Sequence, residues 1–205
     1  MGDFRESMLS SVVTAVEVPA RASADQLLGT AIAALAAGPD ALAEVLEALP
    51  APIYLTDADG WVTHFNSACI GFAGRQPIAG KDRWCVTWRL YDDAGAALPH
   101  ERCPMAVAIK EKRPIRGILA VAERPDGSRV MFAPHPTPIF DGAGRLVGAV
   151  NLLVDVTDRR QSEDLVAQAR RCRRLAQSIM DQRTVDTLLQ MAAEYEQQAA
   201  RLRGR

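Results

Sequence analysis

The hydrophobic positions near the start of the chain recur at the spacing of an α-helix. Ser23 and Gln26 have the form of a capping box, and leucine and isoleucine follow every three or four residues until Gly38. Asp40 is predicted to cap a second helix, whose apolar run of the same kind ends at Leu49. Each helix has a single apolar face, so we expect both helices to pack against a sheet or a second subunit. The residues predicted to make this contact are Leu28, Ile32, Leu35, Leu42 and Leu46.

After residue 50 the apolar residues alternate with a period of two, which indicates β-strands. A tight turn at Asp57–Gly60 joins the first two strands, and a second turn at Pro125–Ser128 joins the third and fourth. Residues 67–74 and 103–112 have the patterns of short helices. We expect five strands, at residues 53–56, 61–66, 116–124, 129–139 and 146–154.

Two stretches depart from these regular patterns. Residues 75–100 have no sustained period and are predicted to be irregular, although the aromatic segment at 84–91 is apolar enough to be buried. Prolines at positions 134, 136 and 138 interrupt the fourth strand, and proline cannot donate to a ladder, so part of this strand must be irregular or lie at an edge. The order of elements predicts an α+β fold with a five-stranded antiparallel sheet and its helices on one face.

From residue 158 onward the pattern is helical again. Apolar residues alternate by three and four in two stretches, a spacing typical of helices that pair with another helix, a second subunit or a partner protein. The phase changes between Asp181 and Thr184, which predicts a kink or a helix-turn-helix. The first stretch carries Leu165, Ala169, Cys172, Ala176 and Ile179, and the second carries Val185, Leu188, Ala192, Tyr195, Ala199 and Leu202.

These patterns divide the chain into four parts. Residues 1–22 are expected to be flexible, apart from a short strand within 11–18. Residues 23–49 form an N-terminal helical cap, and residues 50–157 form a core of sheet and helices. Residues 158–205 form a helical tail, either a coiled coil or a helix-turn-helix.

Composition narrows the class of protein. Hydrophobic residues make up 48% of the 205 residues and charged residues 24%, which is ordinary for a soluble globular protein. The formal net charge of −1 gives no reason to expect binding to nucleic acid or to acidic membranes. The four cysteines lack the paired spacing of a zinc site or a disulfide scaffold. Neither a signal peptide nor a membrane span is evident, so we expect a cytoplasmic protein without a metal site.

The junction between the last strand and the tail has a distinctive sequence. Asp155, Val156 and Thr157 follow the strand directly, and Thr157 or Asp158 is suited to cap the helix that comes next. Upstream, in order, lie an Asp-x-x-Gly turn at 57–60, Phe65-Asn66 at the end of a strand, Ser67-Ala68, and Gly74 at the end of a short helix. Together these segments resemble the PAS domain family over about residues 49–160.

The resemblance implies a sensor fold with a pocket between the sheet and the helices. It also implies dimerisation and signalling through flanking helices, with Asp155, Val156 and Thr157 relaying a change in the core to the tail. It implies no given ligand, because this fold hosts many ligands and some members are empty. The residues expected to line the pocket are Phe65, Cys69, Phe72, Trp84, Trp88, Met105, Ile109, Phe132 and His135.

The best-known PAS cofactors are disfavoured by the residues present. Haem-binding members commonly place a histidine on the helix that here spans residues 104–112, which contains none; His100 lies just before it. Flavin photoreceptors need an Asn-Cys-Arg-Phe-Leu-Gln motif, which does not occur in this chain. The ligand therefore stays unknown. For Trp84 and Trp88 the alternative is simple core packing, and for His135 a pH-responsive role competes with an inert hydrogen bond.

The sequence lacks the groups that common signalling enzymes need. No histidine follows Asp158, so the tail carries no phosphoacceptor of a histidine kinase, and no glycine-rich nucleotide loop is present. We therefore expect a non-enzymatic homodimer that relays a signal to a partner such as a histidine kinase or response regulator. The alternatives are a constitutive dimeric scaffold with a pocket filled by side chains, and a small-molecule enzyme acting near His100 or His135.

Overall fold

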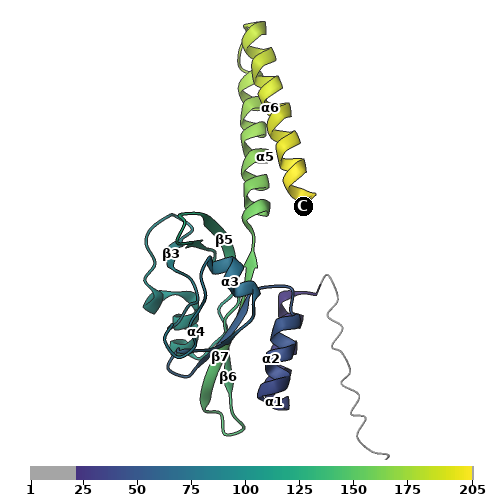
Figure 1. Ribbon diagram of the computed structural model, residues 1–205. Coiled ribbons are helices and arrows are strands. Elements are labelled where there is room, and N and C mark those ends of the chain that lie inside the picture. The colour runs from purple at the N-terminus through teal and green to yellow at the C-terminus, as the bar shows by residue number, and fades with distance from the viewer. Residues whose placement is uncertain (1–21, 205) are drawn as a thin grey trace, which may run out of the picture.

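The computed structural model describes residues 22–204 of the chain (Figure 1). The strand expected within 11–18 and most of the segment expected to be flexible lie outside the described residues. A core of sheet and helices forms one end of the molecule, and a pair of long helices projects from it.

Two helices precede the sheet. α1 (Ala24–Ala37) begins at the predicted capping box: the Gln26 N–H donates to Ser23 Oγ over 3.3 Å, and the Ser23 N–H donates to Gln26 Oε1 over 2.8 Å. α2 (Pro39–Ala48) starts with a proline, whose missing N–H costs nothing in the first turn. The prediction that Asp40 caps this helix is wrong, because the proline precedes it and Asp40 lies inside the first turn.

The core contains one antiparallel sheet of seven strands, so the PAS-like α+β fold is present with a larger sheet than the predicted five strands. The hydrogen-bonded order is β2-β1-β7-β5-β4-β3, and β6 pairs with β7 along the same edge as β5. The strands are β1 (Ile53–Asp57), β2 (Val62–Phe65), β3 (Arg89–Asp92), β4 (Ala120–Glu123), β5 (Arg129–Pro134), β6 (Thr137–Phe140) and β7 (Leu146–Asp155).

Two differences from the expected strands account for the larger number. The strand predicted at 129–139 is split into β5 and β6, because Pro134 and Pro136 interrupt the ladder on either side of His135. β3 falls within the segment predicted to be irregular. Its order comes from pairing with β4, where Leu90 lies opposite Ala122, and not from a local pattern.

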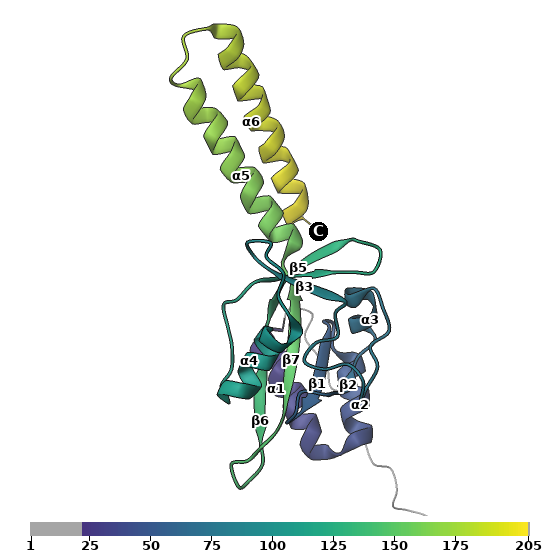
Figure 2. The same cartoon turned by 90° about the vertical axis from the view of Figure 1, so that its left-hand side faces the viewer.

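Helices cover both faces of the sheet rather than one (Figures 1 and 2). α1 and α2 cover one face, where Leu28 and Leu46 are buried together with Ile53 and Val150. α3 (Ala68–Ala73) and α4 (Pro104–Glu111) cover the other face. Successive residues of a strand point to opposite faces, so the apolar run of β7 serves both layers. The N-terminal helices therefore pack on the sheet of their own chain, with Ile32 and Leu35 partly buried and Leu42 buried in the same layer.

Asn66 ties the N-terminal helices to the sheet. Its side chain is 1% exposed, and its Oδ1 accepts the N–H of Ile53 over 3.1 Å. Its Nδ2 donates to the carbonyl oxygens of Leu46 at 3.1 Å and Ala51 at 2.9 Å, with that of Leu49 at 3.4 Å. One buried amide thus holds the end of α2, the connection that follows it, and β1.

The tail is an antiparallel helical hairpin (Figure 2). α5 (Thr157–Ala176) follows β7 directly, and α6 (Gln182–Arg203) folds back along it. Asp181 caps α6 by accepting the N–H of Thr184 over 2.9 Å. The predicted change of phase is therefore a reversal of direction. The side chains buried between the helices are Ala169, Cys172 and Ala192, with Leu188 and Tyr195 packed against them.

Candidate functional site

The space between the sheet and helices α3 and α4 is filled by side chains. Phe72 of α3 and Phe132 of β5 meet edge to face with their ring centroids 5.1 Å apart, and Met105 of α4 is fully buried. We call this buried cluster the inner core. Seven of the residues expected to line a pocket belong to it or pack against it: Phe65, Cys69, Phe72, Trp84, Met105, Ile109 and Phe132.

Trp88 lies outside the inner core. Its side chain is 51% exposed, so the prediction that it is buried with its aromatic neighbours is wrong. Val86 and Thr87 take the buried positions just before it, and they leave the larger indole at the surface. There it lines an open hollow of about 270 Å³ together with Leu98 and Pro99.

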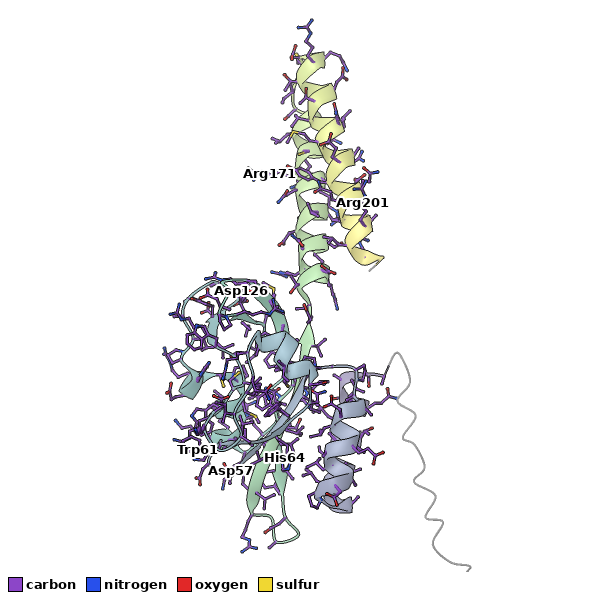
Figure 3. All side chains as sticks on the ribbon, viewed as in Figure 1. Asp57, Trp61, His64, Asp126, Arg171 and Arg201 are labelled. Carbon is purple, nitrogen blue, oxygen red and sulfur yellow. The ribbon has the colours of Figure 1, made fainter. Side chains whose placement is uncertain are left out.

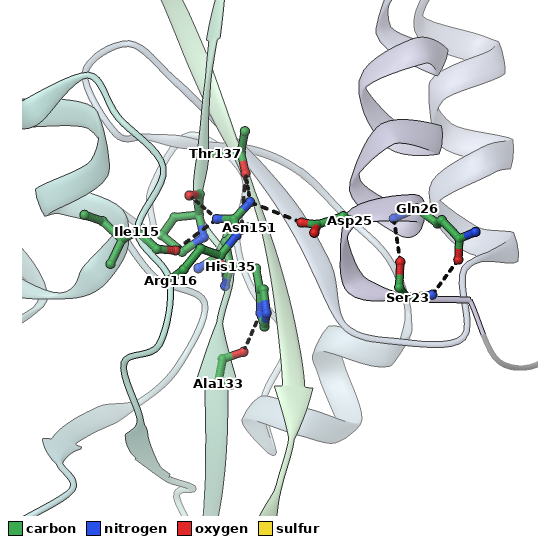
Figure 4. A network of polar contacts seen from close by, with 10 residues as sticks. Ser23, Asp25, Gln26, Ile115, Arg116, Ala133, His135, Thr137 and Asn151 are labelled. Carbon is green, nitrogen blue, oxygen red and sulfur yellow. Dashed lines mark hydrogen bonds and ion pairs between the residues drawn. The ribbon is translucent and has the colours of Figure 1, made fainter.

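His135 lies at the break between β5 and β6. Its ring Nδ1 is 3.0 Å from the carbonyl oxygen of Ala133 (Figure 4). Close by, Arg116 donates to Thr137 Oγ1 over 2.9 Å and reaches Asp25 of α1 at 3.7 Å. His135 therefore neighbours the polar groups that link the break to α1, and it is not among the residues of the inner core.

A line of hydrogen bonds crosses the inner core. The Tyr54 hydroxyl donates to the carbonyl oxygen of Trp84 over 2.9 Å and accepts from Asn151 Nδ2 over 3.0 Å. Asn151 Oδ1 accepts the backbone N–H of His135 over 2.9 Å. Trp84 has a φ of +68°, a conformation rare for a residue with a side chain. Burial raises the pKa of Tyr54 well above its ordinary value, so the hydroxyl keeps the proton that it donates.

Sequence reasoning missed both Tyr54 and Asn151. The available signal was the single asparagine inside the apolar run of β7. A buried amide is costly unless its donors and acceptor are paired, so an asparagine at such a position indicates a polar partner inside the core. Tyr54 gives no comparable signal, because tyrosine is common on half-buried strands.

A second polar group lies on the segment before β3. Cys85 Sγ is 3.1 Å from Thr87 Oγ1, which lies 3.5 Å from His100 Nε2. Burial raises the pKa of the Cys85 thiol, and it raises that of Cys103 to about 12. Both thiols therefore stay protonated at neutral pH, and a protonated thiol is a poor nucleophile.

The unfolding free energy is expected to depend on pH through His100. Burial lowers the pKa of His100 from its usual 6.5, so the folded state holds this proton less tightly than the unfolded chain. The resulting stability is present above pH 6.5 and is lost as the pH falls through the folded-state pKa. Urea titrations of the wild type and His100→Gln between neutral pH and pH 5 should show a smaller loss for the variant. Parallel pH curves for the two proteins would contradict this.

The start of α5 is attached to β5. The Val156 N–H donates to the Met131 carbonyl over 2.9 Å, and the Thr157 hydroxyl accepts the Met131 N–H over 3.0 Å and donates to its carbonyl over 3.2 Å. The prediction that Thr157 or Asp158 caps α5 is wrong, because Val156 holds the cap position without a side-chain bond. Asp155 Oδ1 accepts the Thr157 N–H over 2.8 Å instead.

Met131 lies between two residues of the inner core. Val130 is 4% exposed and Phe132 is 2% exposed, and both point into the inner core because they alternate with Met131 along β5. The start of α5 is therefore joined to the inner core in two ways: through Met131 of β5, and through β7, which contributes Ala149 and Leu153 to the inner core.

The sequence matches the family model of the PAS fold over residues 46–161, which is more than half of the chain. The chain belongs to the PAS family. Its core is therefore a PAS domain, a signalling sensor fold. A comparison with curated protein sequences gave no match.

Solved structures that resemble this PAS protein do so at low identity and with TM-scores below 0.5. An RNA-binding light-oxygen-voltage receptor is 24% identical, with a TM-score of 0.44 over 60% of this chain and 35% of that one. The PAS domain of the fruit-fly ELK potassium channel is 12% identical, with a TM-score of 0.46 over 58% and 96%. The light-oxygen-voltage domain of a blue-light activated histidine kinase from Erythrobacter litoralis is 20% identical, with a TM-score of 0.39 over 53% and 98%. This chain thus spans about a third of the receptor's length.

Between residues 22 and 204, none of the helices combines the length and apolar character that crossing a bilayer requires. Within the same residues, no three histidine, cysteine or acidic side chains gather as metal ligands.

Proposed function

We propose that this PAS protein is a non-enzymatic regulator that senses a small molecule or a cell state in its inner core. It passes the response through α5 and α6 to a signalling partner such as a histidine kinase or response regulator. The attachment of Thr157 to Met131 supports this best, because it joins the first residue of α5 to a strand of the inner core. At the same junction the Asp155 carboxylate accepts the Thr157 N–H, and the Val156 N–H donates to the Met131 carbonyl.

The junction is suited to relay a movement of the sheet to α5 because a single residue separates the two elements. β7 runs into α5 with Val156 alone between them, and three hydrogen bonds hold Val156 and Thr157 to Met131. A ligand shifts such an element only by binding one arrangement more tightly than the other. A group that displaces Phe132 or Val130 favours a different position of Met131 and therefore a different direction of α5.

The second candidate function is a constitutive scaffold, and the packing of the inner core favours it. Surface hollows of about 270, 320 and 730 Å³ occur in the described part of the chain, and Phe72, Met105 and Phe132 line none of these. Native mass spectrometry of freshly purified protein separates the two functions. An extra mass that disappears on denaturation supports the sensor, and a bare protein supports the scaffold.

Neither haem nor a flavin is part of this proposal. Phe72, Met105 and Phe132 fill the space that a large planar ring would need. Burial raises the pKa of Cys69 to about 12, and its thiol donates to the Ile53 carbonyl over 3.3 Å. These features fit a packed core better than a site for covalent flavin chemistry. A visible absorbance band in the purified protein would overturn this part of the proposal.

Replacing Thr157 with valine is expected to uncouple the tail from the core. The valine keeps the shape of threonine but removes the hydroxyl that both accepts from and donates to Met131, at a cost of about 1–2 kcal/mol in unfolding free energy. Hydrogen exchange measures the coupling at the amides of residues 160–163, where the hydrogen bonds of α5 begin with the Arg160 N–H donating to the Val156 carbonyl. In an otherwise wild-type chain, Phe72→Ala should speed exchange at these amides. In a Thr157→Val background it should leave them unchanged.

The matched control for this experiment is Asp158→Asn. Asp158 is the next residue of α5, it is exposed, and among residues 22–204 its side chain has no hydrogen-bond partner. In this background Phe72→Ala should still speed exchange at the start of α5. An equal response in the Thr157 and Asp158 backgrounds would show that the relay does not pass through the Thr157 hydroxyl.

A further inference from the structure

The helical hairpin has an apolar side that lies away from its charged edge. Arg173 of α5 pairs with Glu196 of α6 at 2.8 Å along one edge of the seam between the helices. Neighbouring residues are about 100° apart around a helix, so Cys172 and Tyr195 lie toward the other edge. We call that side the hairpin face. It carries Leu165 and Leu175 of α5, Ile179 of the connection that follows α5, and Leu188, Met191, Tyr195 and Leu202 of α6.

The hairpin face is only partly covered by its own chain. Leu175 is 45% exposed and Met191 is 38% exposed, and the hairpin projects from the core instead of lying against it (Figures 1 and 2). The seam between the helices buries little apolar area, because its fully buried residues are the alanines Ala169, Ala192 and Ala199. An amphipathic helix pair gains most of its stability from a partner surface, and an exposed apolar patch of this kind indicates an interaction site.

Charged residues border the hairpin face on both helices. Asp164 and Arg171 lie seven residues apart beside the apolar residues of α5, and Glu194 and Arg201 lie seven residues apart beside those of α6. All four are exposed, and none forms an ion pair with another residue in the range 22–204. Figure 3 shows Arg171 and Arg201 on the outer sides of the hairpin, away from the seam.

Along the axis of the hairpin, each of these charges lies level with a charge of opposite sign on the other helix. Ser162 Oγ donates to the Ala199 carbonyl over 3.1 Å, which fixes the lower end of the hairpin, and the Arg173–Glu196 pair fixes its middle. Between these two contacts, Asp164 is level with Arg201, and Arg171 with Glu194, to within about one helical turn.

We propose that two copies of this chain pack their hairpin faces together as a four-helix bundle around a two-fold axis parallel to the helices. This axis keeps every residue at its height and brings α5 of one copy against α6 of the other. Asp164 then faces Arg201 of the partner subunit, and Arg171 faces Glu194 of the partner subunit. Opposite charges meet at both heights, and this complementarity selects a second copy over an unrelated partner.

The bundle rests on the proposed relay and adds the partner that the tail binds, which is a second copy of the chain. It also changes which residues are expected to make the contact. Ala169 and Cys172 were predicted to pair with a partner, but they face α6 of their own chain. Leu165 and Ile179 stay on the hairpin face, where Leu175 and Met191 join them. The two core domains of the dimer lie at the same end of the bundle.

Light scattering of the full chain after size exclusion tests the bundle through one pair of matched variants. The wild type should have twice the chain mass of 22.2 kDa across a dilution series. Leu175→Glu places a charge on the hairpin face and should give a monomer. Leu189→Glu makes the same change at a similar exposure of 41%, but Leu189 lies seven residues before Glu196 on the opposite edge, so this variant should remain a dimer.

A charge exchange tests the orientation of the two copies without removing an apolar side chain. Arg171→Glu and Glu194→Arg should each raise the dissociation constant of the dimer roughly tenfold, because each brings like charges together at two symmetric places. The double variant should return to the wild-type value. If circular dichroism shows that Leu175→Glu has lost helix, the double charge-exchange variant decides whether the bundle forms.

A monomeric wild type, a dimer that persists in Leu175→Glu, or a double variant without recovery would each overturn the bundle. These readouts report mass and dissociation, whereas the relay is tested by hydrogen exchange at the start of α5. A dimer with an intact bundle and no exchange response would leave the bundle standing and refute the relay.

Discussion

Phe132→Ala is expected to lower the free energy of unfolding by about 3–5 kcal/mol. Phe132 is 2% exposed and meets the ring of Phe72 edge to face, so its removal leaves a cavity as well as a loss of buried apolar area. The surrounding strands limit how far the structure can collapse into the gap. Urea unfolding followed by circular dichroism measures the change.

The matched control is Phe140→Ala on β6. It removes the same side chain from a position that is 44% exposed, so the expected change is within about 1 kcal/mol. If the two alanine variants were equally stable, the inner core would not be packed as the structure shows. A ligand-sized space at Phe132 would then become the better description, and the sensor function would gain over the scaffold.

Asn66→Ala is expected to cost about 2–4 kcal/mol in unfolding free energy, although it removes only a small polar group. The side chain satisfies the buried N–H of Ile53 and the buried carbonyl of Leu46, together with the partly buried carbonyl of Ala51. Alanine leaves these groups without partners, and a buried unpaired backbone group costs more than the hydrogen bond contributes. The same urea experiment measures the loss.

Two further variants make the Asn66 result specific. Asn66→Asp keeps an acceptor for the Ile53 N–H but replaces the donor with an oxygen that faces carbonyls, so it should be nearly as damaging as alanine. Gln76→Ala removes an exposed amide and should change stability by less than about 0.5 kcal/mol. A loss below about 1 kcal/mol for Asn66→Ala would mean that water replaces the missing bonds.

Features that depend on nearby residues were predictable from the sequence. The capping box at Ser23 and Gln26 forms as expected, because both partners lie within one helical turn. The alternation that predicted β1, β2 and β7 and the periodicity that predicted both tail helices depend on backbone geometry alone. The resemblance to the PAS family rests on the same kind of local segments, and the family match over residues 46–161 confirms it.

Features that depend on distant residues were decided by the tertiary structure. β3 forms because β4 pairs with it, and Trp88 is exposed because its neighbours occupy the buried positions. Thr157 is of a residue type that often caps helices, but its hydroxyl binds Met131, 26 residues earlier in the chain.

The tail shows the same division between sequence and tertiary structure most clearly. The sequence by itself determined that α5 and α6 are amphipathic and that their pattern is interrupted near Asp181, but a kink and a reversal of direction were both open. It did not determine which apolar residues face the other helix, because one stripe can pack against its own hairpin or against another subunit. The fold assigns Ala169 and Cys172 to the internal seam and leaves Leu175 at the surface. Small side chains let the two helices of one chain approach closely, and larger ones such as Leu175 and Met191 then stay at the surface.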